Sequence, residues 1–598
     1  MLDISRYSAD SLRYHIPEIF DLAKKTSSID SLRQMLYQYA HQMEFETFDD
    51  YDSFSERSII RVRDCARAVT RILTRRSEDK SGFSVVQAIR DLSLGESRPD
   101  LKPAFYADLL HLLLGLQGGG AGKGLADLHL VPSQFDGREA AVERSGQLDR
   151  LSNEFERRMA RFASGLEEDS ILRRRRRRRE ILRFLGGSTD DWFDWKWQIK
   201  NIMRDPDMIA SVVDLPDNEK EAIRRARRKR IPFGITPHYL SLMDGEIDGG
   251  RDRAIRAQVI PPASYVELMV GYGKDAASCL DFMRESDTSP INLITRRYPG
   301  ICIFKPFNTC PQICVYCQRN WEIEDAMAPG AMASKEEVNA ALNWIEAHPA
   351  IHEVLITGGD PLAMNDSDLM RILEGVASID SIERIRIGTR TLVTMPMRIT
   401  GRLADMLANY RLPGKRQVAI VTHVQHPYEL TPDTVSAVEK LRSRGISVFN
   451  QLVYTFYISR RFEASFLRRQ LSQLGIEPYY VFNTKGKEET AEYRAPIARL
   501  LQEQKEEARL LPGLSRTDEA VYNVPGLGKN YLRAIQHRDL ISILPDGTRL
   551  YEFHPWEKNI TRIVSTHIGA DVPILDFLQR LDAIGEDVSD YESIWYYF

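Results

Sequence analysis

The chain has 598 residues, of which 43% are apolar and 28% charged, values typical of a globular protein with a large core. Its 81 basic and 85 acidic side chains leave a net charge of −4, which excludes a chain with an overall attraction for nucleic acid. The longest apolar runs are too short to span a bilayer and the first residues do not resemble a signal peptide, so we expect a cytoplasmic protein that enters no membrane.

Residues 1–187 are predicted to form a helical extension of unknown role. A glycine-rich segment at 118–124 interrupts it and faintly resembles a phosphate-binding loop. However, Gln117 stands where that motif requires its first glycine, and Gly124 replaces its Ser or Thr. We therefore interpret this segment as a flexible linker.

Seven consecutive arginines occupy positions 173–179. A helix through them would present no apolar face for about two turns, so the segment must be solvated or matched by an acidic partner. An exposed charged helix is the simplest prediction, and docking to another protein is an alternative. Nucleic-acid binding is favoured least, because no aromatic residues are interleaved for base stacking.

From residue 296 onward, short apolar runs alternate with amphipathic helical segments. This alternation predicts an α/β fold with a parallel sheet, in which six β/α repeats form an open or partial barrel. Ser334 with Glu337, and Thr431 before Pro432, are typical helix starts. Functional groups in such folds gather at the carboxyl ends of the strands. The strand candidates are 301–305, 353–357, 384–389, 417–423, 447–454 and 478–483.

Three of the six cysteines, Cys310, Cys314 and Cys317, form a C-x3-C-x2-C pattern after the first strand candidate. Cysteine is the usual ligand of iron–sulfur clusters, and three thiolates would leave one iron of a [4Fe–4S] cubane open to an external ligand. Structural zinc is the alternative, but it requires four protein ligands and no further cysteine follows Cys317.

Together with its neighbouring segments, this loop resembles the lysine 2,3-aminomutase family of radical S-adenosylmethionine (SAM) enzymes. The similarity runs in the family's order through about 370 residues and ends near residue 560. The matching segments include 191–198, 235–242, 297–299, 357–360, 422–427 and 478–480. The resemblance implies a helical region at 188–295, a radical-SAM partial (β/α)6 barrel at 296–495, and a carboxy-terminal segment at 496–598 that binds pyridoxal 5′-phosphate (PLP).

The family's chemistry moves an amino group from the α to the β carbon of an amino acid. The resemblance implies a [4Fe–4S] cluster that receives one electron from a donor such as flavodoxin or ferredoxin and cleaves SAM to a 5′-deoxyadenosyl radical. It also implies PLP, which carries the substrate, and a homo-oligomer. The cofactors supply the difficult chemistry, so the protein must position them and exclude water.

The resemblance assigns roles to individual residues of this chain. Lys529 is expected to carry PLP, because a lysine amine is needed to hold that cofactor. Arg297 would contact its phosphate. Arg319 would hold the α-carboxylate of the substrate. Gly358, Gly359, Asp360, His423 and Gln451 are expected to contact SAM.

Substrate choice is predicted from two further positions. Lysine-specific members bind the distal ammonium with two aspartates, and the corresponding residues here are Lys485 and Asn523. A like-charge contact at about 4 Å would cost roughly 4 kcal/mol against a lysine substrate. The pair resembles that of glutamate 2,3-aminomutases, so we expect L-glutamate to be converted to β-glutamate. In the alternative, Lys485 faces solvent and Lys487 or another residue sets specificity.

Two departures and two alternatives accompany this prediction. The carboxy-terminal cysteines that bind zinc in lysine-type members are missing, so no zinc is expected, and the residues after Arg319 are less basic than in lysine enzymes.

In one alternative, the same chemistry acts on another amino acid or on a protein-borne lysine. A docking or nucleic-acid-binding protein fused to an inactive aminomutase is the other alternative, although the intact cysteines, Asp360 and Lys529 argue against inactivity.

Overall fold

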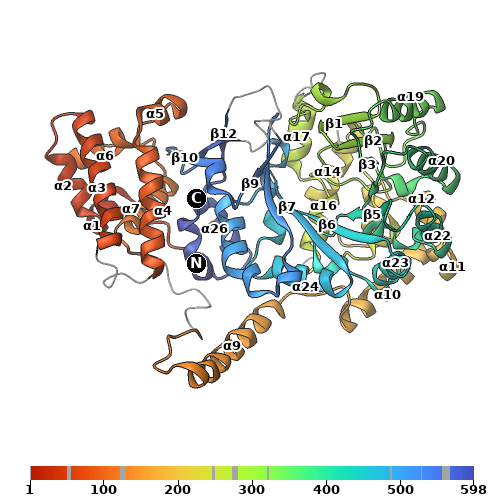
Figure 1. The fold of residues 1–598 in the computed structure, drawn as a ribbon, viewed down its shortest axis with the longest axis horizontal. Helices are drawn as coiled ribbons and strands as arrows, with labels where there is room; N and C mark the ends of the chain where they lie inside the picture. The colour runs from red at the N-terminus through yellow and green to blue at the C-terminus, as the bar shows by residue number, and fades with distance from the viewer. Residues whose placement is uncertain are drawn as a thin grey trace.

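The computed structural model describes residues 2–49, 56–120, 129–244, 250–272, 280–319, 322–484, 488–526, 528–554 and 566–598. The amino-terminal helices form one end of the molecule, and the parallel sheet with its covering helices forms the other (Figure 1). The carboxy-terminal strands and helix lie between them. Within these ranges, every helix is too short or too polar to cross a bilayer.

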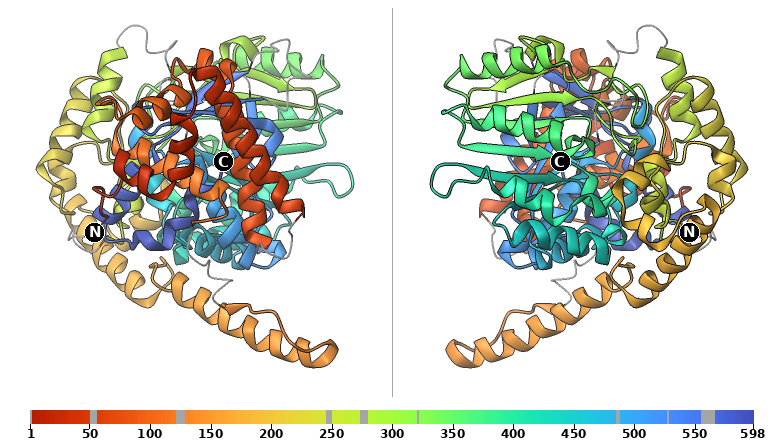
Figure 2. Two further views of the ribbon diagram at one scale, coloured as in Figure 1. Left: turned by 90° about the vertical axis from the view of Figure 1, so that its left-hand side faces the viewer. Right: turned by 90° about the vertical axis from the view of Figure 1, so that its right-hand side faces the viewer.

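The amino-terminal part is helical, as predicted. Helix α9 projects from the body of the molecule (Figure 2), and α10 contains the run of arginines. The helices up to this point are α1 (Ala9–His15), α2 (Pro17–Lys24), α3 (Ile29–Asp49), α4 (Glu56–Ile72), α5 (Arg75–Ser81), α6 (Val85–Leu94), α7 (Pro103–Leu116), α9 (Gly137–Met159) and α10 (Glu168–Leu185).

Helix α10 confirms the prediction of a charged helix, although only part of it is exposed. Arg175, Arg176 and Arg179 are exposed, whereas Arg177 and Arg178 are half-buried on the inner side. The guanidinium of Arg178 lies 6.0 Å from the centre of a tryptophan ring. The helix therefore packs on the body through its buried Ile181 and Leu182 and through the ring contact of Arg178. Short helices follow it: α11 (Thr189–Phe193), α12 (Trp195–Lys200), α13 (Pro206–Ala210), α14 (Asp217–Arg228), α15 (Pro237–Leu240), α16 (Arg253–Val259) and α17 (Ala263–Tyr272).

In the described part of the chain, the main sheet has nine strands in sequence order from β1 to β9. Strands β2 to β8 are parallel, while β1 and β9 are antiparallel edge strands. The strands are β1 (Ile294–Tyr298), β2 (Ile301–Phe307), β3 (Glu353–Gly358), β4 (Arg384–Gly388), β5 (Gln417–Thr422), β6 (Ser447–Tyr454), β7 (Ile476–Asn483), β8 (Glu519–Val524) and β9 (Gly528–Tyr531).

All six strand candidates are confirmed, with ends that differ by at most two residues. Strands β1, β8 and β9 are additional, and β9 contains Lys529. The helices between parallel strands are α19 (Lys335–Glu346), α20 (Asp366–Ala377), α21 (Thr391–Thr394), α22 (Gly401–Ala408), α23 (Pro432–Arg442), α24 (Glu463–Gln473) and α25 (Ile497–Gln502).

The predicted helix starts are confirmed by their hydrogen bonds. Ser334 and Glu337 form a reciprocal capping box at α19, and Thr431 caps α23 ahead of a proline. Helix α23 ends at Arg442, and Gly445 then adopts a φ of 73° in the turn that leads into β6. These caps fix where each helix returns the chain to the sheet.

A second, antiparallel sheet is covered by the amino-terminal helices. It consists of β10 (Arg538–Ile543), β11 (Arg549–Phe553) and β12 (His567–Ala570), and α26 (Ile574–Ala583) follows it. The Arg549 guanidinium forms a buried ion pair with Asp108 of α7 at 2.9 Å. The buried Glu552 of β11 pairs with Arg76 and Lys80 of the helical end. The amino-terminal extension is thus part of one core with the carboxy-terminal segment.

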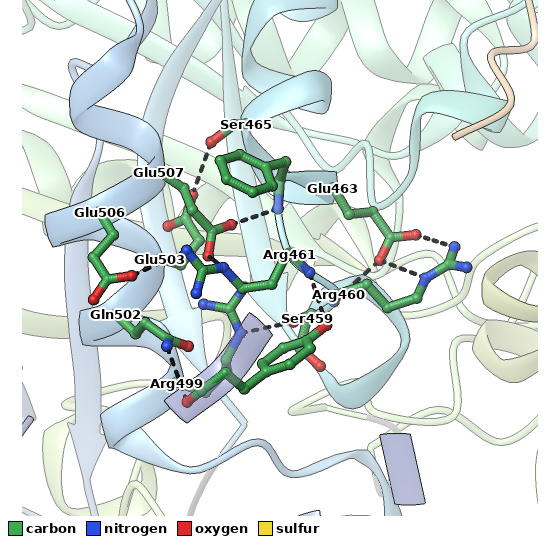
Figure 3. Close-up of polar contacts among 12 residues, drawn as sticks. Ser459, Arg460, Arg461, Glu463, Ser465, Arg499, Gln502, Glu503, Glu506 and Glu507 are labelled. Carbon is green, nitrogen blue, oxygen red and sulfur yellow. Dashed lines mark hydrogen bonds and ion pairs between the residues drawn. The ribbon is translucent and has the colours of Figure 1, made fainter. Parts of the chain in front are cut away.

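Buried ion pairs also join α25 and the residues just before α24 to the segment after α25, where a π-helical turn spans Glu503–Glu507 (Figure 3). The carboxylate of Glu507 forms ion pairs with the guanidinium groups of Arg499, at 2.8 Å, and Arg461, at 2.6 Å. Arg461 also pairs with Glu506 at 3.0 Å. Because these charges are removed from water, loss of one partner would leave an unpaired buried charge. The ion pairs therefore hold the segment that leads into α24 against α25 and the turn that follows it.

Candidate active site

The three cysteines of the C-x3-C-x2-C pattern lie on the loop after β2 and are half-buried. Burial, followed by the charges of Asp360 and of the other two thiols, raises the pKa of Cys310. The sulfur atoms are therefore close enough to repel one another as thiolates, and a bound cationic group would offset that repulsion. In the described part of the chain, no group of three or more His, Cys, Asp or Glu residues is placed to hold a metal ion. A cubane takes one thiolate at each of three irons, so it does not require them to converge on one ion.

The glycine-glycine-aspartate turn at 358–360 packs on the start of the cysteine loop. A Cβ atom at Gly359 would lie 2.0 Å from the carbonyl oxygen of Thr309, so only glycine allows this approach. The buried carboxylate of Asp360 accepts hydrogen bonds from Thr389 Oγ1 at 2.6 Å and from the next backbone N–H at 2.9 Å. Burial raises the pKa of Asp360, and these hydrogen bonds oppose the rise. The turn thus links the ends of β3 and β4 to the cysteines.

Arg390 is a site residue that the sequence patterns do not single out. Its Nη1 lies 2.7 Å from Cys314 Sγ, and its Nη2 lies 2.8 Å from the fully buried carboxylate of Glu429. Burial raises the pKa of Cys314, while the charge of Arg390 lowers it. The signal that indicates Arg390 is its position directly after the strand candidate 384–389, where functional groups gather.

His423 and Gln451 meet through the backbone. His423 Nδ1 lies 2.6 Å from the carbonyl oxygen of Gln451, and Nε2 lies 2.9 Å from the hydroxyl of Tyr316 in the cysteine loop. Burial, and then the charge of Arg390, lowers the pKa of His423 to about 4. The ring is therefore neutral near pH 7 and can donate to that carbonyl and accept from Tyr316. Gln451 lies within β6 rather than at its end.

A cavity of about 1080 Å³ is lined by residues of the main sheet, from the edge strand β1 to the edge strand β9. Four predicted site residues line it together: Arg297, Gln451, Asn523 and Lys529. Lys529 faces Asn523 across the ladder between β8 and β9. Its Nζ lies 4.9 Å from the ring centres of both Tyr298 and Tyr480, which is within cation–π range.

Arg319 lies beside this cavity in a closed ring of four charges. Its guanidinium lies 2.6 Å from Glu285 and 3.3 Å from Glu322. Both carboxylates also face the ammonium of Lys305, at 3.4 and 3.3 Å. The backbone N–H of Arg319 donates to Cys317 Sγ at 3.3 Å. A carboxylate that binds Arg319 must therefore compete with Glu285, which itself lines the cavity.

The remaining predicted residues divide into two groups. The cysteines, the 358–360 turn and His423 lie outside the lining of the cavity, but Gln318 extends the cysteine loop into that lining. Lys485, on which the prediction of glutamate specificity depends, lies outside the described residues, as does Lys487.

The sequence is similar to a known superfamily and to several known proteins. Residues 304–458 match the model of the radical SAM superfamily. An uncharacterized KamA family protein of Methanocaldococcus jannaschii is 40% identical, and the match covers 98% of this chain and 96% of that protein. The glutamate 2,3-aminomutase of Clostridioides difficile is 32% identical over 60% of this chain and 80% of that protein. The L-lysine 2,3-aminomutase of Bacillus subtilis is 33% identical over 61% and 73%, respectively.

The α/β fold, its parallel sheet and the three-cysteine loop at the carboxyl end of β2 are those of a radical SAM enzyme. Within that superfamily, the chain belongs to the KamA family, and glutamate and lysine 2,3-aminomutases are among its relatives. Membership implies a [4Fe–4S] cluster, SAM, a small-molecule substrate and a reductant. The half-buried thiols and the guanidinium beside Cys314 fit an anionic, cysteine-ligated cluster.

Proposed function

We propose that the protein is a PLP-dependent 2,3-aminomutase that moves the α-amino group of an amino acid to the β carbon, with L-glutamate as substrate and β-glutamate as product. The observation that carries this proposal is the convergence of Lys529, Arg297, Asn523 and Gln451 on one cavity beside the cysteine loop. The relatives named as glutamate and lysine 2,3-aminomutases support the same reaction type.

Residues around Lys529 fit a PLP site. When bound, the cluster with SAM supplies the radical that removes a hydrogen atom, and PLP supplies a π system through which nitrogen can migrate. Lys529 would provide the amine that holds PLP, and the rings of Tyr298 and Tyr480 lie within cation–π range of that amine. Arg297 lines the same cavity and would bind the phosphate with its planar guanidinium.

The turn at 358–360, with His423 and Gln451, is proposed to position SAM at the open iron. Arg390 would stabilise the thiolate of Cys314 by donating to its sulfur. His423, being neutral, holds the cysteine loop to β6 through Tyr316 without adding charge beside the cluster. These residues act by binding and orientation.

Arg319 is proposed to bind the α-carboxylate of the substrate after Glu285 moves away, because a second carboxylate cannot take the same face of the guanidinium. Asn523 and Lys485 are proposed to contact the distal carboxylate. Asn523 lies opposite Lys529 on the cavity wall, which supports this assignment.

Several features of the whole chain belong to the same proposal. The sheet would act as a partial (β/α)6 barrel within residues 296–495, between a helical region at 188–295 and a PLP-binding segment at 496–598. Residues 1–187 would form a helical extension of unknown role. A flavodoxin or ferredoxin would supply electrons, the assembly would be a homo-oligomer, and no zinc would be required.

The experiment is anaerobic reconstitution with iron and sulfide, followed by SAM, PLP, reductant and pooled amino acids, with β-amino isomers detected by mass spectrometry. β-Glutamate is the expected product, and it should be missing with Lys529→Ala and Cys314→Ala. A different β-isomer would support the same chemistry on another substrate. Full cofactor loading without any isomer would overturn the proposal and favour a docking protein with an inactive aminomutase.

A further inference from the structure

The cavity that contains Lys529 continues to the opposite end of the sheet. Its lining includes Glu353, Arg384 and Gln417, which are aligned residues at the amino-terminal ends of β3, β4 and β5. The next residues along these strands that line it are Ile303, Leu355 and Arg386. Gln451 lies further toward the carboxyl ends of the strands, and the pair of Asn523 and Lys529 lies beyond it. The cavity therefore has an opening at the amino-terminal ends of the strands, separate from the cysteine loop. We call this opening, lined by Glu353, Arg384 and Gln417, the lower mouth.

This lower mouth reaches solvent beside the loop at 411–416, between α22 and β5. Arg411 and Lys415 are exposed and line the cavity. Backbone hydrogen bonds of 2.8 and 2.7 Å between Leu412 and Arg416 close the loop into a hairpin. The guanidinium of Arg411 packs over Gly445, where a Cβ atom would lie 3.0 Å from Arg411 Cζ. The two cations are thus held by a structured turn at the rim.

The charges at the lower mouth are unbalanced. Arg384 and Arg386 share one carboxylate, that of Glu353, at 2.8 and 2.6 Å. The guanidinium of Arg416 donates hydrogen bonds to two backbone carbonyl oxygens, at 3.0 and 2.6 Å. Carbonyl groups are neutral, so they leave the positive charge of Arg416 unbalanced. Among the described residues, Arg411 and Lys415 make no ion pair. The acidic residues of this part of the lining are Glu353 and Glu383, against Arg384, Arg386, Arg411, Lys415 and Arg416.

A cationic rim around a cavity of low dielectric attracts small anions and raises their local concentration. We propose that the lower mouth binds the carboxylates of a dicarboxylic amino acid and admits it to the cavity from the amino-terminal ends of the strands. This proposal rests on the proposed function, because it assigns an entry route to the acidic substrate of the same cavity. It leaves the cysteine-loop end to SAM.

The test uses a thiol placed inside the mouth. Ser447 lines the cavity and is half-buried, and Ser447→Cys is nearly isosteric. The cluster-loaded enzyme would be treated with methanethiosulfonates that carry either a sulfonate or a trimethylammonium group, and modification at position 447 would be measured by peptide mass spectrometry. At low salt, the anionic reagent should react about tenfold faster than the cationic one, and added salt should remove the difference.

Two further variants separate local from global charge. Arg411→Glu with Lys415→Glu should abolish the anion preference, whereas Arg175→Glu with Arg176→Glu, the same charge change on exposed positions of α10, should preserve it. L-Glutamate should protect the introduced thiol and L-lysine should not, and the protection should be lost with Arg411→Glu and Lys415→Glu. Equal rates for the two reagents, or no protection by L-glutamate, would overturn the proposal.

These measurements require no turnover, so the entry route and the proposed aminomutase reaction can be refuted separately. Protection by L-glutamate in an enzyme that forms no β-isomer would retain the anion site and remove the aminomutase. Formation of β-glutamate without charge preference or protection at position 447 would retain the aminomutase and remove the entry route.

Discussion

Arg390 connects the cluster loop to the protein interior, since one guanidinium contacts both Cys314 and the buried Glu429. Hydrogen bonds and positive charge beside a cluster sulfur are among the factors that set its reduction potential. This residue is therefore expected to tune electron uptake as well as to hold the loop.

Replacing Arg390 by Met should lower the midpoint potential of the cluster and lower the free energy of unfolding by about 3–5 kcal/mol, because Glu429 would remain buried without its cation. Adding Glu429→Gln should recover most of the stability but not the potential. Urea unfolding and an EPR redox titration measure the two effects. A wild-type potential in the double variant would contradict the role assigned to Arg390.

His238 is fully buried, and burial lowers its pKa to about 4 from a usual value near 6.5. Between these values the unfolded chain binds the proton that the folded chain does not, so stability falls as the pH falls from about 6.5 to 4 and is fully present above that window. The expected loss at pH 5 is about 2 kcal/mol for this residue.

His238→Phe should remove nearly one proton from the pH dependence of unfolding between pH 6.5 and 5. Urea midpoints of the apo protein across that range give the slope, and the wild-type protein is the reference. Identical slopes for the two proteins would show that His238 is not buried in its neutral form.

At the scale of elements, the contact between the turn at 358–360 and the cysteine loop is a close backbone approach beside the candidate cluster site. Gly359→Ala would place a Cβ atom 2.0 Å from a carbonyl oxygen, so one of the two segments must move. We expect iron incorporation and SAM binding to fall about tenfold or more, a loss on the scale expected when residues that support a metal site are displaced.

The matched control for Gly359 is Gly513→Ala, since a Cβ atom at Gly513 would meet no other atom within 4 Å and this glycine has no positive φ. Iron content, the visible absorbance of the cluster and equilibrium dialysis of SAM would be compared. Equal loading of both variants would contradict the proposed support of the cluster loop by this turn.

The strands that alternate regularly with helices can be predicted from the sequence, because buried parallel strands appear as short apolar runs. Strands β8 and β9 do not follow this alternation and are not predicted from it. Gly528–Tyr531 is short and polar, and it is a strand because it pairs with Glu519–Val524 at the edge of the sheet. Arg390 and Glu285 are likewise not indicated by this alternation, since their roles depend on contacts between distant segments rather than on any local motif.

At the scale of the whole molecule, the amino-terminal helices contribute directly to the fold of the carboxy-terminal sheet. The buried pair of Asp108 and Arg549 joins the two. Asp108→Ala should lower the free energy of unfolding by about 3–5 kcal/mol, since the guanidinium would remain buried alone.

The double variant Asp108→Ala with Arg549→Leu should recover much of that loss, because no unpaired charge would remain in the interface. Chemical denaturation of the wild-type protein, both single variants and the double variant measures the coupling. Additive effects of the two substitutions would contradict a direct pair and would separate the extension from the stability of the sheet.

Composition and helical pattern predict that residues 1–187 are helical, yet no sequence signal indicates that they cover the sheet of β10, β11 and β12. Such packing depends on surfaces more than 400 residues apart in the chain, as Asp108 and Arg549 illustrate, and those surfaces become recognisable only when both are folded. The resemblance to known enzymes begins after residue 187, so it gives no guide to this interface.

The proposed aminomutase reaction is tested most directly by following the amino nitrogen of the substrate. L-Glutamate labelled with ¹⁵N would be incubated with the reconstituted enzyme, SAM, PLP and reductant in the presence of unlabelled ammonium. The expected product is β-glutamate that retains the ¹⁵N, because the amino group would migrate within one molecule held beside Lys529. Product without the label, or no β-glutamate from an enzyme whose cluster binds and cleaves SAM, would contradict it.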